Sequence, residues 1–486
     1  MSIERKAISA LKWATAAKLV VQIASWAGTL VVVRLLTPDD YGLMAKISVV
    51  CSIAGAIAEL GLGAAIVRSA DIAYNDLRRI YGVSLLLGAG MTTAVAAAAP
   101  LLSRLFQEPG LTWPIAGASL QIVVVAAAIV PVAMATRNLS FRRLAKIEMV
   151  AGVFGIAAAL LLALLGAGVW ALVLGTLFGA ITRSTALLLL GERVWPLFSP
   201  RGIGEHLKFG LTLVGSRVSY FIVVQSDVLI GSAFLSTTEI GQYSVALQLA
   251  SLPMAKAMGV INEITLPVVA RQQGDLPSVR QTLLKSLGFI SLIAFPALWG
   301  ISTVAPELVL VLLGPKWLEA VPALAILPLV VPVRMLCSVM FTASLALGNR
   351  KLDLRNTIIN FTLLPGGFFI GAHWGLVGLC SAWLVSVPLA YAFSVPAMLR
   401  FIGISARDVM VECGPPAVAA GVMYAAVASL RIVVGEQQPA IAALCMLSAA
   451  GAVVYLGVMA LISPRHLVNA RNFARSLRAR DTPESG

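Results

Sequence analysis

The chain has 486 residues, of which 59% are hydrophobic and only 12% are charged, and its mean hydropathy is +0.92. Soluble domains carry about 25% charged residues, so this composition excludes a soluble globular protein and predicts membrane helices. The net charge of +14 does not indicate nucleic-acid binding, because the positive residues are spread over many short loops instead of one basic face.

The long apolar stretches predict 14 membrane-spanning helices, each close to the roughly 17–25 residues that a spanning helix needs. Helices are expected because an open sheet leaves backbone groups unsatisfied in lipid. The predicted spans are residues 13–34, 41–66, 79–101, 113–135, 147–166, 168–190, 209–233, 241–265, 283–305, 321–347, 355–372, 374–398, 411–432 and 439–462. They predict an all-α polytopic membrane protein.

Positive charge alternates from one gap between spans to the next. When charges near span ends are counted with the neighbouring gap, the two termini and every second gap hold 27 Lys and Arg, and the other gaps hold 4. The positive-inside rule therefore predicts a multi-pass protein with both termini in the cytoplasm. The same charges favour contact with anionic membrane lipids.

Short motifs recur in the same order in the two halves of the chain. Leu36–Gly42 and Leu235–Gly241 both fit L-[ST]-x-x-[DE]-x-G, at an offset of 199 residues. Two weaker pairs follow at offsets of 211 and 205: Ala135–Asn138 with Ala346–Asn349, and Gly166–Trp170 with Gly371–Trp374. Six spans separate the copies, so we predict a parallel repeat about an axis along the membrane normal.

The repeat and the longest gap, at about residues 191–208, suggest how the chain is organised. We predict one six-helix bundle over residues 1–200 and a second over residues 201–400. Residues 401–486 then add two spans and a basic cytoplasmic tail.

Five basic residues fall inside the predicted spans: Lys18, Lys46, Arg217, Lys256 and Arg334. Charges at this depth are costly and by default mark a site or a pathway. The 199-residue offset relates Lys18 to Arg217, which puts a cation at the same depth in the first helix of each half. We predict that the five line a central cavity for an anionic phosphate or diphosphate group, because Arg binds such groups bidentately and Lys as a point charge.

Two of these cations also have a simpler interpretation. Lys18 lies close enough to the inner surface to extend its ammonium into the interface. Arg334 lies in a proline-rich span, where a salt bridge or a backbone carbonyl would stabilise a broken helix.

Three acidic residues in the spans, Glu59, Asp227 and Glu263, are candidates for coupling to a Na⁺ or H⁺ gradient. The alternatives are pairing with a cation and, for Glu59, exposure at the interface. No other cofactor and no metal site is predicted, since the cysteines and histidines lack ligand spacing and no Walker loop is present. We find no catalytic constellation and expect no enzyme. A polysaccharide polymerase or ligase is the enzymatic alternative, although such enzymes usually carry a large outer loop.

The motifs as a group are those of a known family. They are Arg34–Leu43 (RLLTPDDYGL), Asp227–Gly231, Gly241–Ala246, Leu266-Pro267 and Arg271–Asp275. In them the chain resembles the polysaccharide transporter (Wzx/WzxC-like) family of the multidrug/oligosaccharidyl-lipid/polysaccharide flippase superfamily, over roughly residues 10–400.

This resemblance implies a flippase for undecaprenyl-diphosphate-linked oligosaccharide units in the bacterial inner membrane, serving exopolysaccharide or lipopolysaccharide synthesis. It implies alternating access, ion coupling, and partners that include membrane lipids and a polysaccharide polymerase with its synthesis complex. Related lipid II flippases carry cavity cations on the spans where this sequence has Lys18, Lys46 and Lys256. The nearest different class is an ion-coupled multidrug exporter of the same superfamily.

Overall fold

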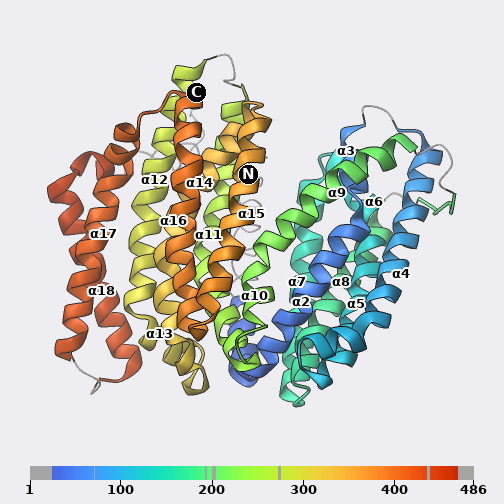
Figure 1. Cartoon of the computed structure of the whole chain (residues 1–486), viewed down its shortest axis with the longest axis horizontal. Helices are drawn as coiled ribbons and strands as arrows, with labels where there is room; N and C mark the ends of the chain where they lie inside the picture. The colour runs from blue at the N-terminus through green and yellow to red at the C-terminus, as the bar shows by residue number, and fades with distance from the viewer. Residues whose placement is uncertain are drawn as a thin grey trace, which may run out of the picture. The chain divides into compact units, whose positions relative to one another are not determined.

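A computed structural model describes residues 25–69, 72–191, 194–199, 204–271, 275–434 and 438–468, and every regular element in these ranges is a helix (Figure 1). Ten of the described helices are long and apolar enough to cross a membrane. The all-α polytopic fold class is thereby confirmed. The count of 14 is not confirmed: the helices at predicted spans 1, 7, 8 and 11 are not among the ten, and span 1 begins outside the described residues.

Contacts divide the chain into two compact units, Met1–Gly241 and Gln242–Gly486. The division falls inside one long helix, α11 (Thr237–Arg271), whose first turn belongs to the first unit. The boundaries expected at residues 200 and 400 stay a prediction.

The first unit contains a helix over Ser25–Leu35, then α2 (Pro38–Glu59), α3 (Leu62–Arg68), α4 (Tyr74–Leu105), the 3-10 turn η1 (Pro109–Leu111), α5 (Thr112–Ala126), α6 (Ile129–Arg137), α7 (Phe141–Leu164), α8 (Val169–Leu190), α9 (Gly204–Val224) and α10 (Ser226–Gly231). The second unit contains most of α11, then α12 (Leu276–Thr303), α13 (Ala305–Leu312), the 3-10 turn η2 (Pro315–Ala320), α14 (Val321–Ala346), α15 (Arg350–Ala372), α16 (Gly375–Ile402), α17 (Ala406–Val434) and α18 (Ala440–Ile462).

Three spans that the sequence predicts as continuous are each built from two helices. Between α2 and α3, Leu60 and Gly61 adopt left-handed backbone angles (φ 45° and 59°) that end one helix and start the next. Between α5 and α6, Pro131 has no N–H to bond the carbonyl of Ala127, so the α-helical ladder is interrupted there. A third break, at Gln225, separates α9 from α10.

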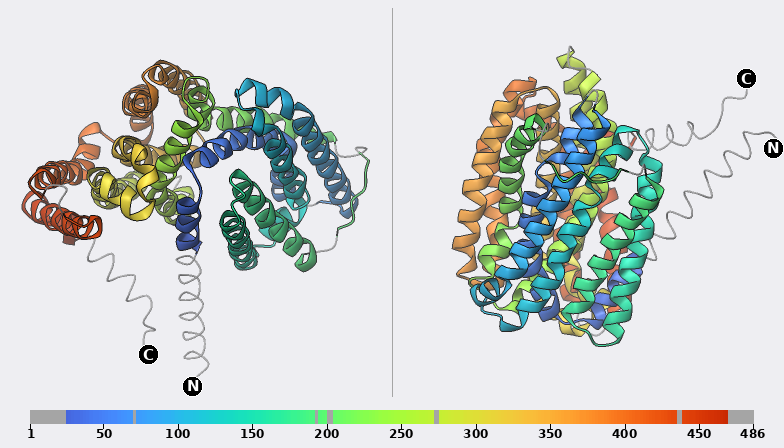
Figure 2. Two further views of the ribbon diagram at one scale, coloured as in Figure 1. Left: turned by 90° about the horizontal axis from the view of Figure 1, so that it is seen from below. Right: turned by 90° about the vertical axis from the view of Figure 1, so that its right-hand side faces the viewer.

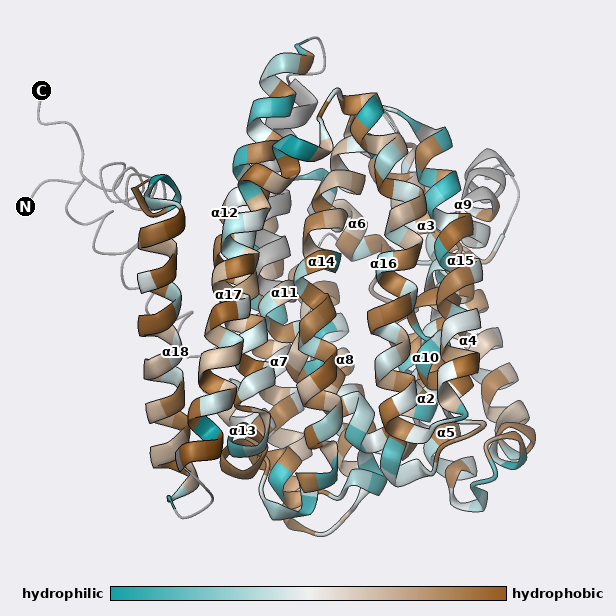
Figure 3. Cartoon of the chain, turned by 60° about the vertical axis from the view of Figure 1, so that its left-hand side comes forward, coloured by the Kyte–Doolittle hydropathy of each residue, from teal (hydrophilic) through white to brown (hydrophobic). Residues whose placement is uncertain are grey.

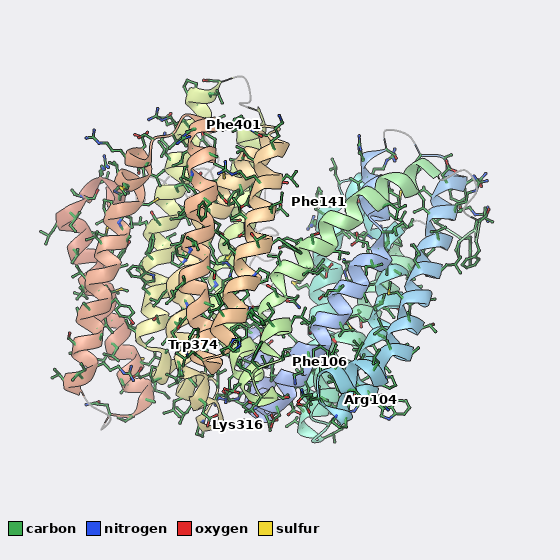
Figure 4. All side chains as sticks on the ribbon, viewed as in Figure 1. Arg104, Phe106, Phe141, Lys316, Trp374 and Phe401 are labelled. Atoms are coloured by element: carbon green, nitrogen blue, oxygen red, sulfur yellow. The ribbon has the colours of Figure 1, made fainter. Side chains whose placement is uncertain are left out.

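Hydropathy and helix ends agree with a membrane protein. Figure 3 shows α18 mostly in the colour of hydrophobic residues along its length. In the second unit, Lys316 and Trp374 lie at one end and Phe401 at the other (Figure 4), as expected for loops on opposite membrane sides. Arg183, counted above with the long gap, instead lies within α8 and pairs with Glu148 at 2.5 Å.

Two helical hairpins sit where the third repeated motif predicts equivalent turns. Helices α7 and α8 pack closely (Figure 2). A methyl group at Gly175 would lie 2.6 Å from Cβ of Ala159. Helices α15 and α16 also pack closely, with Gly371 and Gly378 in mutual contact. Small residues allow this close approach of helix backbones in a membrane.

Candidate functional site

The two copies of the first repeated motif begin helices in the same way. Thr37 and Asp40 form a capping box at the start of α2, in which the Asp40 carboxylate accepts from the Thr37 N–H at 2.9 Å and from its hydroxyl at 2.7 Å. At the start of α11, the Glu239 carboxylate accepts from the Ser236 N–H at 2.9 Å and from its hydroxyl at 2.8 Å. The spacing Thr/Ser-x-x-Asp/Glu is therefore explained by helix capping.

The two motif copies also contact each other, within the first unit. A methyl group at Gly42 would lie 1.9 Å from the carbonyl oxygen of Thr237, and one at Gly241 would lie 1.8 Å from that of Pro38. Gly42 and Gly241 are 199 residues apart, and so are Pro38 and Thr237. Replacing each residue by its equivalent in the other motif copy therefore turns the first contact into the second. This is the pattern expected of a local two-fold axis.

A hydrogen bond from Thr238 to Asp39 agrees with this local symmetry, because these two residues are also 199 apart. A residue that contacts its own repeat equivalent lies close to the axis that relates the copies. The repeat predicted from sequence therefore has a structural counterpart at this crossing of α2 and the first turn of α11.

Lys46 lies beside the crossing and is 2% exposed. Its ammonium donates to the Thr237 hydroxyl at 2.7 Å and forms an ion pair with Glu108 at 3.3 Å, while the Thr237 hydroxyl also donates to Glu108. We call these three residues the Lys46 cluster. Glu108 follows the end of α4, two residues after Phe106, and Figure 4 labels Arg104 and Phe106 at that end of the helix.

The Lys46 cluster has a consequence for the predicted cationic cavity. A buried ammonium needs compensation, and Glu108 supplies it. In this conformation the charge of Lys46 is already balanced, so it would bind an anionic ligand only after separating from Glu108. Its assignment as a substrate-binding residue stays a prediction.

Arg334 is in a different environment, in the second unit. Its guanidinium carbon lies 4.4 Å from the centre of the Trp383 ring, a cation–π contact. Among the described side chains, no carboxylate lies within ion-pair distance of it. Helix α14 runs over Val321–Ala346 with Pro328 and Pro332 inside it.

Trp383 is itself tightly held. It is 4% exposed, and its indole N–H donates to the hydroxyl of Tyr243 at 2.8 Å. The ring of Phe368 packs against it with ring centres 4.9 Å apart. Tyr243 and Phe368 are both fully buried. We call Arg334, Trp383, Tyr243 and Phe368 the Arg334 cluster.

Two of the predicted acidic residues lie in the described part of the first unit. Asp227 is 1% exposed at the start of α10, and its carboxylate accepts from the Val228 N–H at 2.7 Å. Glu59 lines a cavity of about 400 Å³ whose polar lining includes Ser48, Ser52 and Gln121. Both positions are compatible with ion coupling, which stays a prediction. In the described ranges, no three His, Cys, Asp or Glu side chains are grouped to hold a metal ion.

The side chains of the other predicted site residues are not among those that the structure describes. Lys18 precedes the first described residue. Arg217 lies in α9, and Lys256 and Glu263 lie in α11, but their side chains are not among those described.

A protein-family comparison decides the family. The model described as polysaccharide biosynthesis protein matches residues 31–322, which is more than half of the chain. The chain belongs to the polysaccharide biosynthesis protein family. The matched range includes both copies of the first motif and the whole Lys46 cluster, and it ends before Arg334.

Curated relatives of known name are similar over most of the chain. The lipopolysaccharide biosynthesis protein WzxC of Escherichia coli is 24% identical over 82% of this chain and 83% of its own length. The succinoglycan biosynthesis transport protein ExoT of Rhizobium meliloti is 25% identical over 93% of this chain and 92% of its own length.

Solved structures show the same fold at low identity. The lipid II flippase MurJ in an inward closed conformation has a TM-score of 0.72 and is 15% identical, covering 93% of this chain and all of its own. An inward-facing MATE multidrug transporter has a TM-score of 0.60 at 15% identity, covering 79% of this chain and 96% of its own. The chain therefore shares the fold of these two transporters.

Sequence reasoning missed the partners of the two described cations. Glu108 lies 62 residues from Lys46, in a gap between spans, and nothing in its local sequence indicates an ion pair. Trp383 is an ordinary apolar residue in its span pattern. Tyr243 had one signal, since it belongs to a motif that carries the family resemblance.

Proposed function

We propose that this protein is a flippase that carries undecaprenyl-diphosphate-linked oligosaccharide repeat units across the bacterial inner membrane, for exopolysaccharide or lipopolysaccharide synthesis. Family membership and the multi-pass fold support this, and so does the name of ExoT, a biosynthesis transport protein. On this proposal the protein is a transporter and not an enzyme. Both of its termini lie in the cytoplasm.

The observation that carries the proposal is the half-buried cation Arg334, which has no described carboxylate beside it. A charge inside a membrane helix is costly and by default marks a functional site. A diphosphate has the opposite charge and the geometry for bidentate binding by a guanidinium. Lys18, Arg217 and Lys256 complete the proposed cationic cavity, and Lys46 joins it when its pair with Glu108 opens.

The transport cycle would be driven by an ion gradient. We propose Asp227, Glu59 and Glu263 as candidates for binding Na⁺ or H⁺. Asp227 is supported by its burial, and Glu59 by its place on the wall of a cavity that Ser48, Ser52 and Gln121 also line. A polysaccharide polymerase and its synthesis complex are the proposed protein partners.

Deleting the gene and locating the lipid-linked unit tests the function. A missing flippase leaves single lipid-linked units on the cytoplasmic leaflet. A missing polymerase or ligase would instead leave them on the outer leaflet. A missing multidrug exporter, the alternative suggested by the shared MATE fold, would leave the polymer unchanged and alter drug resistance.

Arg334→Ala in the complementing gene tests the site. Charge-assisted hydrogen bonds contribute about 1.5–3 kcal/mol each, so we expect polymer export to fall at least about tenfold at equal protein level. Arg400→Ala is the matched control, because Arg400 is an exposed arginine at the end of α16 in the same unit. Wild-type export by Arg334→Ala would refute the role of Arg334.

A further inference from the structure

In the Arg334 cluster the cation contacts an aromatic ring, whereas in the Lys46 cluster the cation contacts a carboxylate. A carboxylate neutralises its partner and occupies its hydrogen-bond donors. A ring face attracts a guanidinium without cancelling its charge. A guanidinium has five N–H donors, and a ring face does not occupy them as the oxygens of a carboxylate do.

The Trp383 ring, which Arg334 contacts, is held in place by two further side chains. The Tyr243 hydroxyl holds the indole N–H at 2.8 Å, and Phe368 packs against the ring. These side chains come from α11, α15 and α16, whereas Arg334 comes from α14. Four helices of the second unit therefore contribute to setting the orientation of one guanidinium.

We propose that Trp383 is a positioning residue for substrate binding: it holds the Arg334 guanidinium in the orientation that receives the diphosphate of the lipid-linked substrate, and Tyr243 holds Trp383 in turn. This inference rests on the proposed function. Its physical basis is preorganisation, because a flexible arginine side chain loses rotamer freedom when it binds an anion, and one already held against a fixed ring has less of that freedom to lose.

The size of the effect follows from the cost of ordering one side chain. Immobilising a side chain with many rotamers weakens binding by about twofold to tenfold. Trp383→Leu keeps an apolar side chain at this buried position but removes the aromatic face. We therefore expect it to weaken diphosphate binding by about three- to tenfold, and Trp383→Phe, which keeps a face, to weaken it less.

The experiment measures the binding of undecaprenyl diphosphate to the full-length protein in lipid nanodiscs. Inorganic diphosphate serves as a competitor, to separate recognition of the phosphate from recognition of the lipid. Trp299→Leu is the matched control. Trp299 is in the same unit, donates its indole N–H to the Leu329 carbonyl at 3.1 Å and packs edge-on against Phe295. None of the cation–π contacts among the described side chains involves it.

A double-mutant cycle distinguishes positioning from a general structural role. If Trp383 acts through Arg334, then Trp383→Leu weakens binding in the wild-type background and has no further effect in Arg334→Ala. An equal loss in both backgrounds, or an equal loss from Trp299→Leu, would overturn the inference. If Trp383→Leu does not fold, Trp383→Phe and Tyr243→Phe are measured in the same cycle.

Failure of the proposed function gives a different result. Wild-type protein that does not bind undecaprenyl diphosphate would contradict the function and the inference with it. Wild-type binding that is unchanged in Trp383→Leu would contradict the inference alone.

Discussion

Removing the counter-charge of Lys46 is the sharpest test of the first unit. Glu108→Gln keeps the shape of the side chain but leaves a 2%-exposed ammonium without a carboxylate. At 3.3 Å and an effective dielectric constant of about 20, the lost attraction is about 5 kcal/mol before desolvation is considered. Breaking a buried pair costs about 3–5 kcal/mol. Because the Glu108 side chain is 32% exposed and partly screened, we expect about 2–3 kcal/mol.

The assay is the midpoint of thermal unfolding in detergent at a fixed scan rate. For a unit of this size, about 2–3 kcal/mol corresponds to a midpoint about 4–12 °C lower. Glu148→Gln is the matched control, since its pair with Arg183 is more exposed and is expected to contribute at most about 1 kcal/mol. Replacing both partners, as Lys46→Met with Glu108→Leu, should restore most of the stability. An unchanged midpoint in Glu108→Gln, or a double variant as unstable as the single one, would refute this reasoning.

Two further predictions concern the repeat and the topology. Gly42→Ala and Gly241→Ala should each lower the yield of folded protein and the unfolding midpoint, because the added methyl group meets a backbone carbonyl that has little room to move. Gly55→Ala, in α2 with no atom near the added methyl, is the control, and equal stability of all three would contradict the crossing. A membrane-impermeant thiol reagent should label Gly110→Cys in intact cells and Arg142→Cys only after permeabilisation, above the background of the native cysteines, and the reverse pattern would invert the topology.

Much of the fold could be predicted from the sequence because lipid leaves the backbone few choices. A long apolar stretch in a membrane must be helical, and the described helices lie where the apolar stretches predicted them. The repeated motif that contains Thr37 and Ser236 was found in the sequence, and the structure shows that both copies cap helices. The helix break at Leu60 was not predicted, because an apolar residue in a left-handed conformation leaves no trace in hydropathy.

The candidate site was also predictable only in its local features. The sequence alone determined that charges such as Lys46 and Arg334 lie inside spans, because hydropathy and charge are properties of a short window. Only the tertiary structure decided what faces each charge. Lys46 meets Glu108 from a distant loop, and Arg334 meets the ring of Trp383 from another helix. Whether a membrane charge is neutralised or left available to a ligand depends on such long-range contacts, and no local pattern encodes them.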